Sequence, residues 1–259
     1  MKFASLGSGS EGNALLIFAA SGTTNTTVML DCGFGIRETE RRLTRLGLSG
    51  ADISGIVVTH EHQDHVSGVF RFARRHRIPV WLSYGTYQSV RRDAADVTIH
   101  MCRGGEKFVI GDLEFHPYTV PHDAREPVQY VAGNGRVRLG VLTDAGHVTS
   151  HMIETLSGCD ALMLECNHDR QMLADSAYSP VLKRRIGGPY GHLSNMAAAD
   201  ILTALDRSRL KAVVGAHLSR RNNTPELARA ALCKALGDDY TPVAIACQDK
   251  GFNWIRLDG

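Results

Sequence analysis

Four side chains that can bind metal ions lie close together at positions 60–65. Residues 59–65 read THEHQDH, an H-x-H-x-D-H spacing that directly follows a β-branched run. A loop leaving the carboxyl end of a buried strand can direct alternate side chains into one cavity, so His60 and His62 would share one metal ion and Asp64 and His65 would serve a second. Imidazole nitrogens suit zinc and similar ions, and the carboxylate adds a harder oxygen ligand. The alternative is a solvated polar loop that happens to be rich in histidine.

The elements that must position these side chains alternate between strands and helices. Hydrophobic patterning predicts helices at 36–46, 66–76 and 194–205, another opening at 224–226, and strands at 2–6, 14–18, 27–31, 55–59, 79–82, 161–165, 210–216, 243–246 and 253–257. A period near two from 107 to 142, with turns at 111–112 and 133–135, predicts hairpins. These patterns predict an α+β fold, an αββα sandwich of two β-sheets flanked by helices, as one domain over residues 1–259. A doubly wound parallel sheet is the alternative, and the density of hairpins argues against it.

Composition sets broad limits on the class of protein. The 259 residues are 43% hydrophobic and 22% charged, which is ordinary for a globular enzyme and argues against a disordered, collagen-like or disulfide-framework chain. No stretch approaches the roughly 18 apolar residues of a membrane span, and the start lacks the apolar core of a signal peptide, so we expect no membrane partner and a cytoplasmic location. Six cysteines are spread singly without a C-x-x-C pair, and a net charge of +2 neither requires nor forbids a nucleic-acid partner.

The motif at 59–65 resembles the signature of the metallo-β-lactamase-fold hydrolases, and the resemblance covers almost the whole chain. It implies roles for four residues that follow other predicted strands. Asp31 matches the family's early aspartate, which supports the metal loop, and His122 matches the third-motif histidine. Asp144 matches the bridging aspartate, and His217 matches the last ligand. The resemblance therefore implies two divalent ions, most consistent with zinc and with manganese or iron open, held by seven side chains: His60, His62, Asp64, His65, His122, Asp144 and His217.

Four further segments resemble the YycJ/VicX (WalJ) branch of this family, whose members are DNA 5′–3′ exonucleases. They are residues 7–13 (GSGSEGN), 164–169 (LECNHD), 191–195 (GHLSN) and 217–223 (HLSRRNN). The first is not a phosphate-binding P-loop, because no Gly-Lys-Ser/Thr follows it, and it would either shape the pocket or form a plain tight turn.

Residues outside the ligand set receive catalytic or supporting roles. Relatives that cleave phosphodiesters carry a histidine in the interval between Asp144 and His217, where His192 lies. We therefore assign catalysis to Asp64 and to His192, which would steady an oxyanion or protonate the leaving oxygen. The alternative for His192 is a capping or packing role before the helix at 194. We place Asp31 and His168 behind the ligands, with a purely structural role for His168 equally open.

Basic residues gather at 71–77, 183–185 and 220–221. A solvated face is the first interpretation of each cluster. Arg220 and Arg221 stand out because they follow His217 within one turn, so together with Ser219 they are candidates to bind substrate at a phosphate flanking the scissile one.

Formal charge indicates the class of substrate. Five neutral histidines, two aspartates, two divalent cations and a bridging hydroxide leave the site at +1, which favours an anionic substrate. We therefore expect a dinuclear metal-dependent phosphodiesterase acting through a metal-bridging hydroxide, with DNA or another phosphodiester as partner. The resemblance to the YycJ/VicX (WalJ) branch implies that this enzyme is a 5′–3′ DNA exonuclease, and a homodimer is the prior for a soluble enzyme. A hydrolase of a small substrate (a cyclic phosphodiester, lactone or thioester) and a non-catalytic metal-binding module are the alternatives. Asp144 and His217 are too close in sequence for the extra domain of a β-CASP nuclease.

Overall fold

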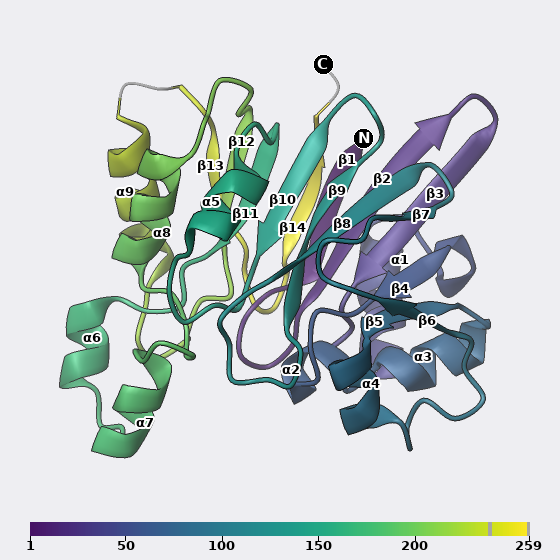
Figure 1. The fold of residues 1–259 in the computed structure, drawn as a ribbon, viewed down its shortest axis with the longest axis horizontal. Coiled ribbons are helices and arrows are strands. Elements are labelled where there is room, and N and C mark those ends of the chain that lie inside the picture. Colours follow the sequence, from purple (N-terminus) through teal and green to yellow (C-terminus); the bar gives the residue numbers. More distant parts are fainter. Residues whose placement is uncertain (238–239, 258–259) are drawn as a thin grey trace.

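The computed structural model describes residues 1–237 and 240–257, and its framework is two seven-stranded β-sheets (Figure 1). In spatial order the first sheet contains β14 (Phe252–Arg256), β1 (Lys2–Gly7), β2 (Ala14–Ser21), β3 (Thr24–Leu30), β4 (Gly55–Val57), β5 (Val80–Ser83) and β6 (Ile99–Cys102). The second contains β13 (Val243–Ile245), β12 (Ala212–Ala216), β11 (Ala161–Glu165), β10 (Arg138–Leu142), β9 (Val128–Gly133), β8 (Leu113–Thr119) and β7 (Phe108–Ile110).

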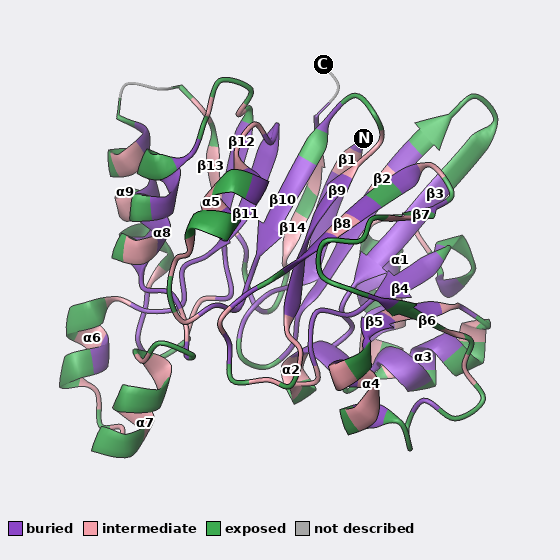
Figure 2. Ribbon diagram, viewed as in Figure 1, coloured by how far each residue is buried: buried purple, intermediate pink, exposed green. Residues whose placement is uncertain are grey.

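The two sheets pack against each other through alternate residues of their strands. Because successive side chains of a strand point to opposite faces, Leu15 and Ile17 of β2 enter the core between the sheets while Leu16 enters a different core on the outer face. Phe115 of β8 and Tyr130 of β9 contribute to the inter-sheet core from the second sheet. The inner strands of both sheets are accordingly buried along most of their length, while the edge strands β6, β7, β13 and β14 are partly exposed (Figure 2).

Helices cover the outer face of each sheet. The first sheet packs against α1 (Ile36–Arg45), α3 (Val69–His76) and α4 (Tyr84–Val90). The second packs against α5 (Ser150–Leu156), α8 (Asn195–Ala204) and α9 (Pro225–Leu236). These layers confirm the predicted αββα sandwich. No helix in the described part of the chain has both the length and the apolar character needed to cross a bilayer.

Several elements differ from the sequence-based expectations. The helix predicted at 66–76 begins later, as α3 at Val69, because Val66 ends a separate short helix, α2 (Gln63–Val66). A Cβ on Gly68, between the two helices, would lie only 1.9 Å from the carbonyl oxygen of Phe34. The pattern did not predict α4, α5, β6, α6 (Arg170–Asp175) or α7 (Pro180–Ile186). These elements are short, and α7 buries none of its residues, so hydrophobic periodicity gave little signal. In Figure 1, α6 and α7 lie away from the sheets, beside the lower end of the second one.

Candidate metal centre

The candidate ligands come from one edge of the sandwich, where strands of both sheets end. Asp31 directly follows β3, and the motif follows β4; these two strands are parallel. Asp144 comes shortly after β10, and His217 directly follows β12; both strands run parallel to β11. Because neighbouring parallel strands end at the same edge of their sheet, Asp31 and the motif lie together at the edge of the first sheet, and Asp144 and His217 lie together at the edge of the second.

Main-chain hydrogen bonds fix the turn that carries the motif. The Asn13 amide donates to the Asp64 carbonyl at 2.8 Å, and the Cys32 amide donates to the His65 carbonyl at 2.8 Å. Gly33 allows this close approach, since a Cβ there would lie 1.9 Å from the carbonyl oxygen of Asp64. The segment at 7–13 therefore helps to shape the site and is more than a plain turn.

One group of ligand atoms comes from His60, His62 and His122, and these atoms lie within 4.8 Å of one another. The Nε2 atom of His122 is 3.2 Å from Nδ1 of His62, and the His60 ring centroid lies 4.6 Å from that of His62. His60 is fully buried and His122 nearly so, while His62 is half-buried. Three imidazoles with converging nitrogens form a set of ligands that suits zinc.

A second group comes from Asp64, His65 and His217, again within 4.8 Å. Asp64 Oδ2 lies 3.4 Å from Nε2 of His65 and 3.3 Å from Nε2 of His217. Asp144 stands between the two groups, with its carboxylate oxygens 3.1 Å from Nε2 of His65, 3.0 Å from Nδ1 of His217 and 3.9 Å from Nε2 of His122. One carboxylate therefore contacts ligands of both groups.

The electrostatics and the unpartnered atoms of this cluster fit a bound cation. Burial would raise the pKa of Asp144, but His217 and His65 outweigh it and hold that pKa well below its ordinary value. Burial would lower the pKa of His65 and of His217, but carboxylates, Asp144 foremost, raise both. The carboxylates thus need positive charge beside them, which a divalent cation would supply in place of those protons. His60 Nε2 and Asp144 Oδ2 are buried without a properly oriented hydrogen bond.

Asp31 orients His65 from behind the cluster. Its Oδ1 accepts from the Thr59 amide at 2.8 Å, and its Oδ2 accepts from the Thr59 hydroxyl at 2.9 Å and lies 2.8 Å from His65 Nδ1. A proton on Nδ1 of His65 leaves the lone pair of Nε2 directed at Asp64 and Asp144. Asp31 has a φ of 61°, a left-handed conformation that aspartate and asparagine adopt more readily than most residues.

A buried carboxylate that the sequence analysis did not assign, Glu165, lies at the end of β11. Its Oε1 is 2.7 Å from Nδ1 of His192 and 3.4 Å from Nδ1 of His217, and its Oε2 accepts from the amides of Ala145 and Leu193. Burial alone would lower the pKa of His192, but Glu165 and then Asp144 raise it to about 9. Glu165 and His192 also belong, with Asp144 and His217, to a further group of potential ligands.

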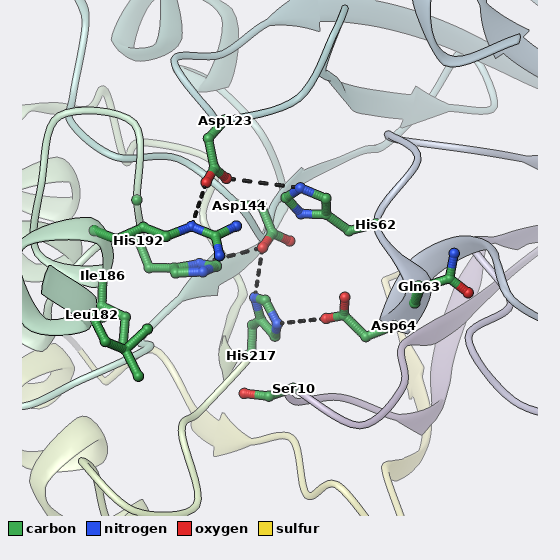
Figure 3. Close-up of a pocket in the computed structure, with 12 residues that line it drawn as sticks. Ser10, His62, Gln63, Asp64, Asp123, Asp144, Leu182, Ile186, His192 and His217 are labelled. Atoms are coloured by element: carbon green, nitrogen blue, oxygen red, sulfur yellow. Dashed lines mark hydrogen bonds and ion pairs between the residues drawn. The ribbon is translucent and has the colours of Figure 1, made fainter. Parts of the chain in front are cut away.

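A cavity of about 320 Å³ opens beside these residues (Figure 3). Candidate ligands from both groups line it, and Figure 3 shows Asp144 and His217 at its centre with His192 beside them. Other parts of the lining are Ser10, Gln63, Asp123, Leu182, Arg185, Ile186 and Gly191.

Comparison with known proteins identifies the family. Residues 26–218 match the family model described as a beta-lactamase superfamily domain. The chain is 34% identical over 239 residues to exodeoxyribonuclease YycJ of Bacillus anthracis, covering 91% of this chain and 89% of that protein. The chain belongs to the metallo-β-lactamase superfamily. This membership confirms the predicted class of enzyme, a metal-dependent hydrolase.

Other relatives and solved structures agree with this assignment. Exodeoxyribonuclease WalJ of Streptococcus pneumoniae is 29% identical over 240 residues, covering 91% of this chain and 88% of that one. The metallo-β-lactamase-fold protein YhfI from Bacillus subtilis has a TM-score of 0.75 at 14% identity, with 98% and 99% of the two chains covered. Zn²⁺-bound PqqB from Methylobacterium extorquens has a TM-score of 0.74 at 16% identity, with 99% and 100% covered. The two structures share the fold of this chain.

The structure gathers the seven predicted ligands and His192 at one place, but not the predicted substrate-binding residues. Arg220 forms ion pairs with Glu11 and Asp249, and its neighbour Arg221 lies over the ring of Tyr178. The Ser219 hydroxyl accepts from backbone amides of its own turn. None of these three residues lines the cavity.

The other residue placed behind the ligands, His168, is buried near Glu165. No hydrogen bond joins its side chain to a candidate ligand within the described residues, and its Nδ1 has no partner there. Burial lowers the pKa of His168 to about 4. Its backbone carbonyl accepts from the Asn195 amide at the start of α8, which is a structural role.

Sequence reasoning gave Glu165 and Arg185 no part in this site, and it considered residues 7–13 as a pocket-shaping loop without a role for the side chain of Asn13. Asn13 Nδ2 lies 3.3 Å from Asp64 Oδ2 and 3.1 Å from His65 Nε2, so this side chain also contacts the motif. Glu165 carries a weak signal in the sequence, since it is an acidic residue ending an apolar strand. Arg185 belongs to the 183–185 cluster, for which a solvated face was the first interpretation.

Proposed function

We propose that this protein is a DNA exonuclease that uses two divalent metal ions and degrades a strand in the 5′–3′ direction. The observation that carries the proposal is the convergence of two ligand groups joined by Asp144 in a chain whose relatives, over nine-tenths of its length, are named exodeoxyribonucleases. The direction follows the branch that the sequence resembles.

The ligand sets indicate where the ions would be held. His60, His62 and His122 would hold one ion, Asp64, His65 and His217 the other, and Asp144 would bridge them. Sites rich in imidazole with few carboxylates favour zinc, and the oxygen ligands leave manganese or iron open. When bound, such ions supply an activated water at neutral pH and withdraw charge from the phosphodiester.

His192 would protonate the departing oxygen. The Nδ1 atom of His192 lies 2.7 Å from Oε1 of Glu165, and no hydrogen bond within the described residues involves Nε2 of His192. Because the side chain lines the cavity, a proton on Nε2 can be donated to a substrate there. Asp64 completes the predicted catalytic pair as a ligand of the second ion, beside His65 and His217.

Substitution of His192 tests this assignment. We expect His192→Ala to lower kcat on DNA by about 10²–10⁴-fold, the usual size of a general-acid contribution, with metal content unchanged. The matched control is His151→Ala, on the outer helix α5, which should leave kcat unchanged. Loss of a metal ion together with activity would make His192 a ligand and overturn its role as the acid.

A substrate panel tests the proposed activity itself. Purified, metal-replete protein is assayed on linear duplex DNA with 5′-phosphate ends, single-stranded DNA, RNA and a small bis-aryl phosphodiester. We expect mononucleotides to be released from 5′ ends of DNA. Cleavage of the small diester alone would favour the small-substrate alternative, and turnover of lactones or thioesters without phosphodiester cleavage would overturn the phosphodiesterase assignment.

A further inference from the structure

One wall of the cavity is a helix whose apolar side chains have no protein core to cover them. Helix α7 contributes Leu182, Arg185 and Ile186 to the lining, yet none of its residues is buried. Leu182 and Ile186 are four residues apart and share one helix face. Figure 3 shows both across the cavity from Asp64. An apolar pair at this spacing ordinarily faces a core, whereas here it faces the cavity.

The chain after α7 fixes this wall relative to the candidate ligands. The Ile186 carbonyl accepts from the His192 amide at 2.8 Å, and the Gly191 carbonyl lies 3.0 Å from Nδ1 of His122. A Cβ at Gly191 would lie 2.1 Å from the carbonyl oxygen of Arg185, so the segment passes directly against the end of the helix. The wall is thus tied by backbone to the residues that would perform the chemistry.

Arg185 brings a positive charge with free donors to the same wall. Its Nε donates to Asp123 Oδ2 at 2.7 Å, and the other oxygen of Asp123 lies 3.8 Å from Nε2 of His62. A guanidinium has five N–H donors, and no second side-chain hydrogen bond of Arg185 occurs within residues 1–237 and 240–257. The planar arrangement of the remaining donors matches the oxygens of a phosphate.

We propose that α7 forms the subsite for the terminal nucleotide of the DNA strand. Leu182 and Ile186 would contact its base, and Arg185 would donate to its phosphate. The cavity of about 320 Å³ is at the small end of the range for ligand sites and suits a single nucleotide. This inference rests on the proposed exonuclease function and adds to it the residues that recognise the strand end.

The base contact is tested by changing the enzyme and the substrate together. Wild-type protein and the double variant L182A/I186A are compared on a strand with a normal 5′ nucleotide and on one with an abasic 5′ nucleotide. We expect wild type to prefer the normal end by about tenfold in kcat/KM, from the apolar area that the base covers, and the double variant to lose this preference. An equal preference in both proteins would overturn the base contact.

The phosphate contact is tested with two neighbouring arginines. We expect Arg185→Ala to raise KM for DNA by about tenfold, with a smaller effect on hydrolysis of the small diester, because a charge-assisted hydrogen bond is lost. Arg184→Ala is the matched control, since this exposed residue of the same helix does not line the cavity. As a binding measurement, dAMP at millimolar concentration should raise the Tm of metal-replete wild type and Arg184→Ala more than that of Arg185→Ala.

These experiments can contradict the nucleotide subsite without contradicting the exonuclease function on which it rests. If wild type degrades DNA and Arg185→Ala behaves like Arg184→Ala in KM and in the dAMP shift, the phosphate contact is overturned while the exonuclease function stands. If wild type degrades no DNA, the proposed function fails, and the nucleotide subsite with it.

Discussion

Replacing Asp31 by asparagine should weaken metal binding without unfolding the protein. Asparagine retains an oxygen where Oδ1 accepts from the Thr59 amide, but places an N–H₂ group where Oδ2 faces His65 Nδ1. The proton on His65 must then move to Nε2, the nitrogen that lies 3.1 Å from Asp144 Oδ2. A protonated Nε2 has no lone pair for a metal ion, so His65 is lost as a ligand.

The size of the effect follows from the contact that is lost. A hydrogen bond to a charged group contributes about 1.5–3 kcal/mol, and changes to residues that orient metal-binding histidines weaken metal affinity by about 10–100-fold. We expect a loss of that size for Asp31→Asn. Asparagine tolerates the φ of 61° at this position, whereas alanine would add about 1–2 kcal/mol of backbone strain, so asparagine isolates the effect on His65.

Zinc competition against a chromophoric chelator measures this affinity, and thermal unfolding checks the fold. Asp112→Asn is the matched control, because the Asp112 carboxylate also accepts several hydrogen bonds, from Thr24 and Thr26, and belongs to none of the ligand groups. Wild-type zinc affinity in a folded Asp31→Asn protein would refute the argument that Asp31 selects the tautomer of His65.

Two further predictions concern packing. Gly33→Ala should lower the free energy of unfolding by more than about 3 kcal/mol, since its Cβ would lie 1.9 Å from the Asp64 carbonyl oxygen. Gly35→Ala has open space around it but replaces the N-cap of α1, so it should lower that free energy by only about 1 kcal/mol. Equal denaturant midpoints for the two variants would contradict this. A thiol reagent at pH 8 should quickly modify the two exposed cysteines, Cys233 and Cys247. Burial raises the pKa of the other four thiols and blocks access to them, so all six should react only after unfolding. Rapid reaction of more than two thiols in the folded protein would contradict the burial of Cys32, Cys102, Cys159 and Cys166.

The motif and the sheets could be predicted from sequence because their signals are local. The spacing of His60 to His65 lies within one turn, and the alternation of β2 or β8 is visible in a few residues. His122, Asp144 and His217 needed the family resemblance, since each is a single polar residue after a strand. In the structure, the strands before Asp144 and His217, β10 and β12, lie on either side of β11 and run parallel to it, so the residues that follow them end up close together.

Glu165 and Arg185 could not be predicted because their roles depend on tertiary contacts. At the end of an apolar run, Glu165 differs little from any polar residue that terminates a strand, and only the pairing of β10, β11 and β12 brings it to His192. Arg185 stands in a basic run typical of a solvated surface, and the fold of α7 against the cavity gives it a different environment. Arg220 illustrates the opposite case, since its closeness in sequence to His217 did not bring it into the cavity.

We propose that seven side chains from both sheets hold two divalent ions. Elemental analysis of protein loaded with zinc and then desalted tests it most directly, with Asp144→Ala analysed alongside because Asp144 contacts ligands of both groups. We predict two zinc ions per chain in the wild type and a loss of bound zinc in folded Asp144→Ala. A folded wild-type protein that retains no ion, or an Asp144→Ala variant that retains both, would contradict it.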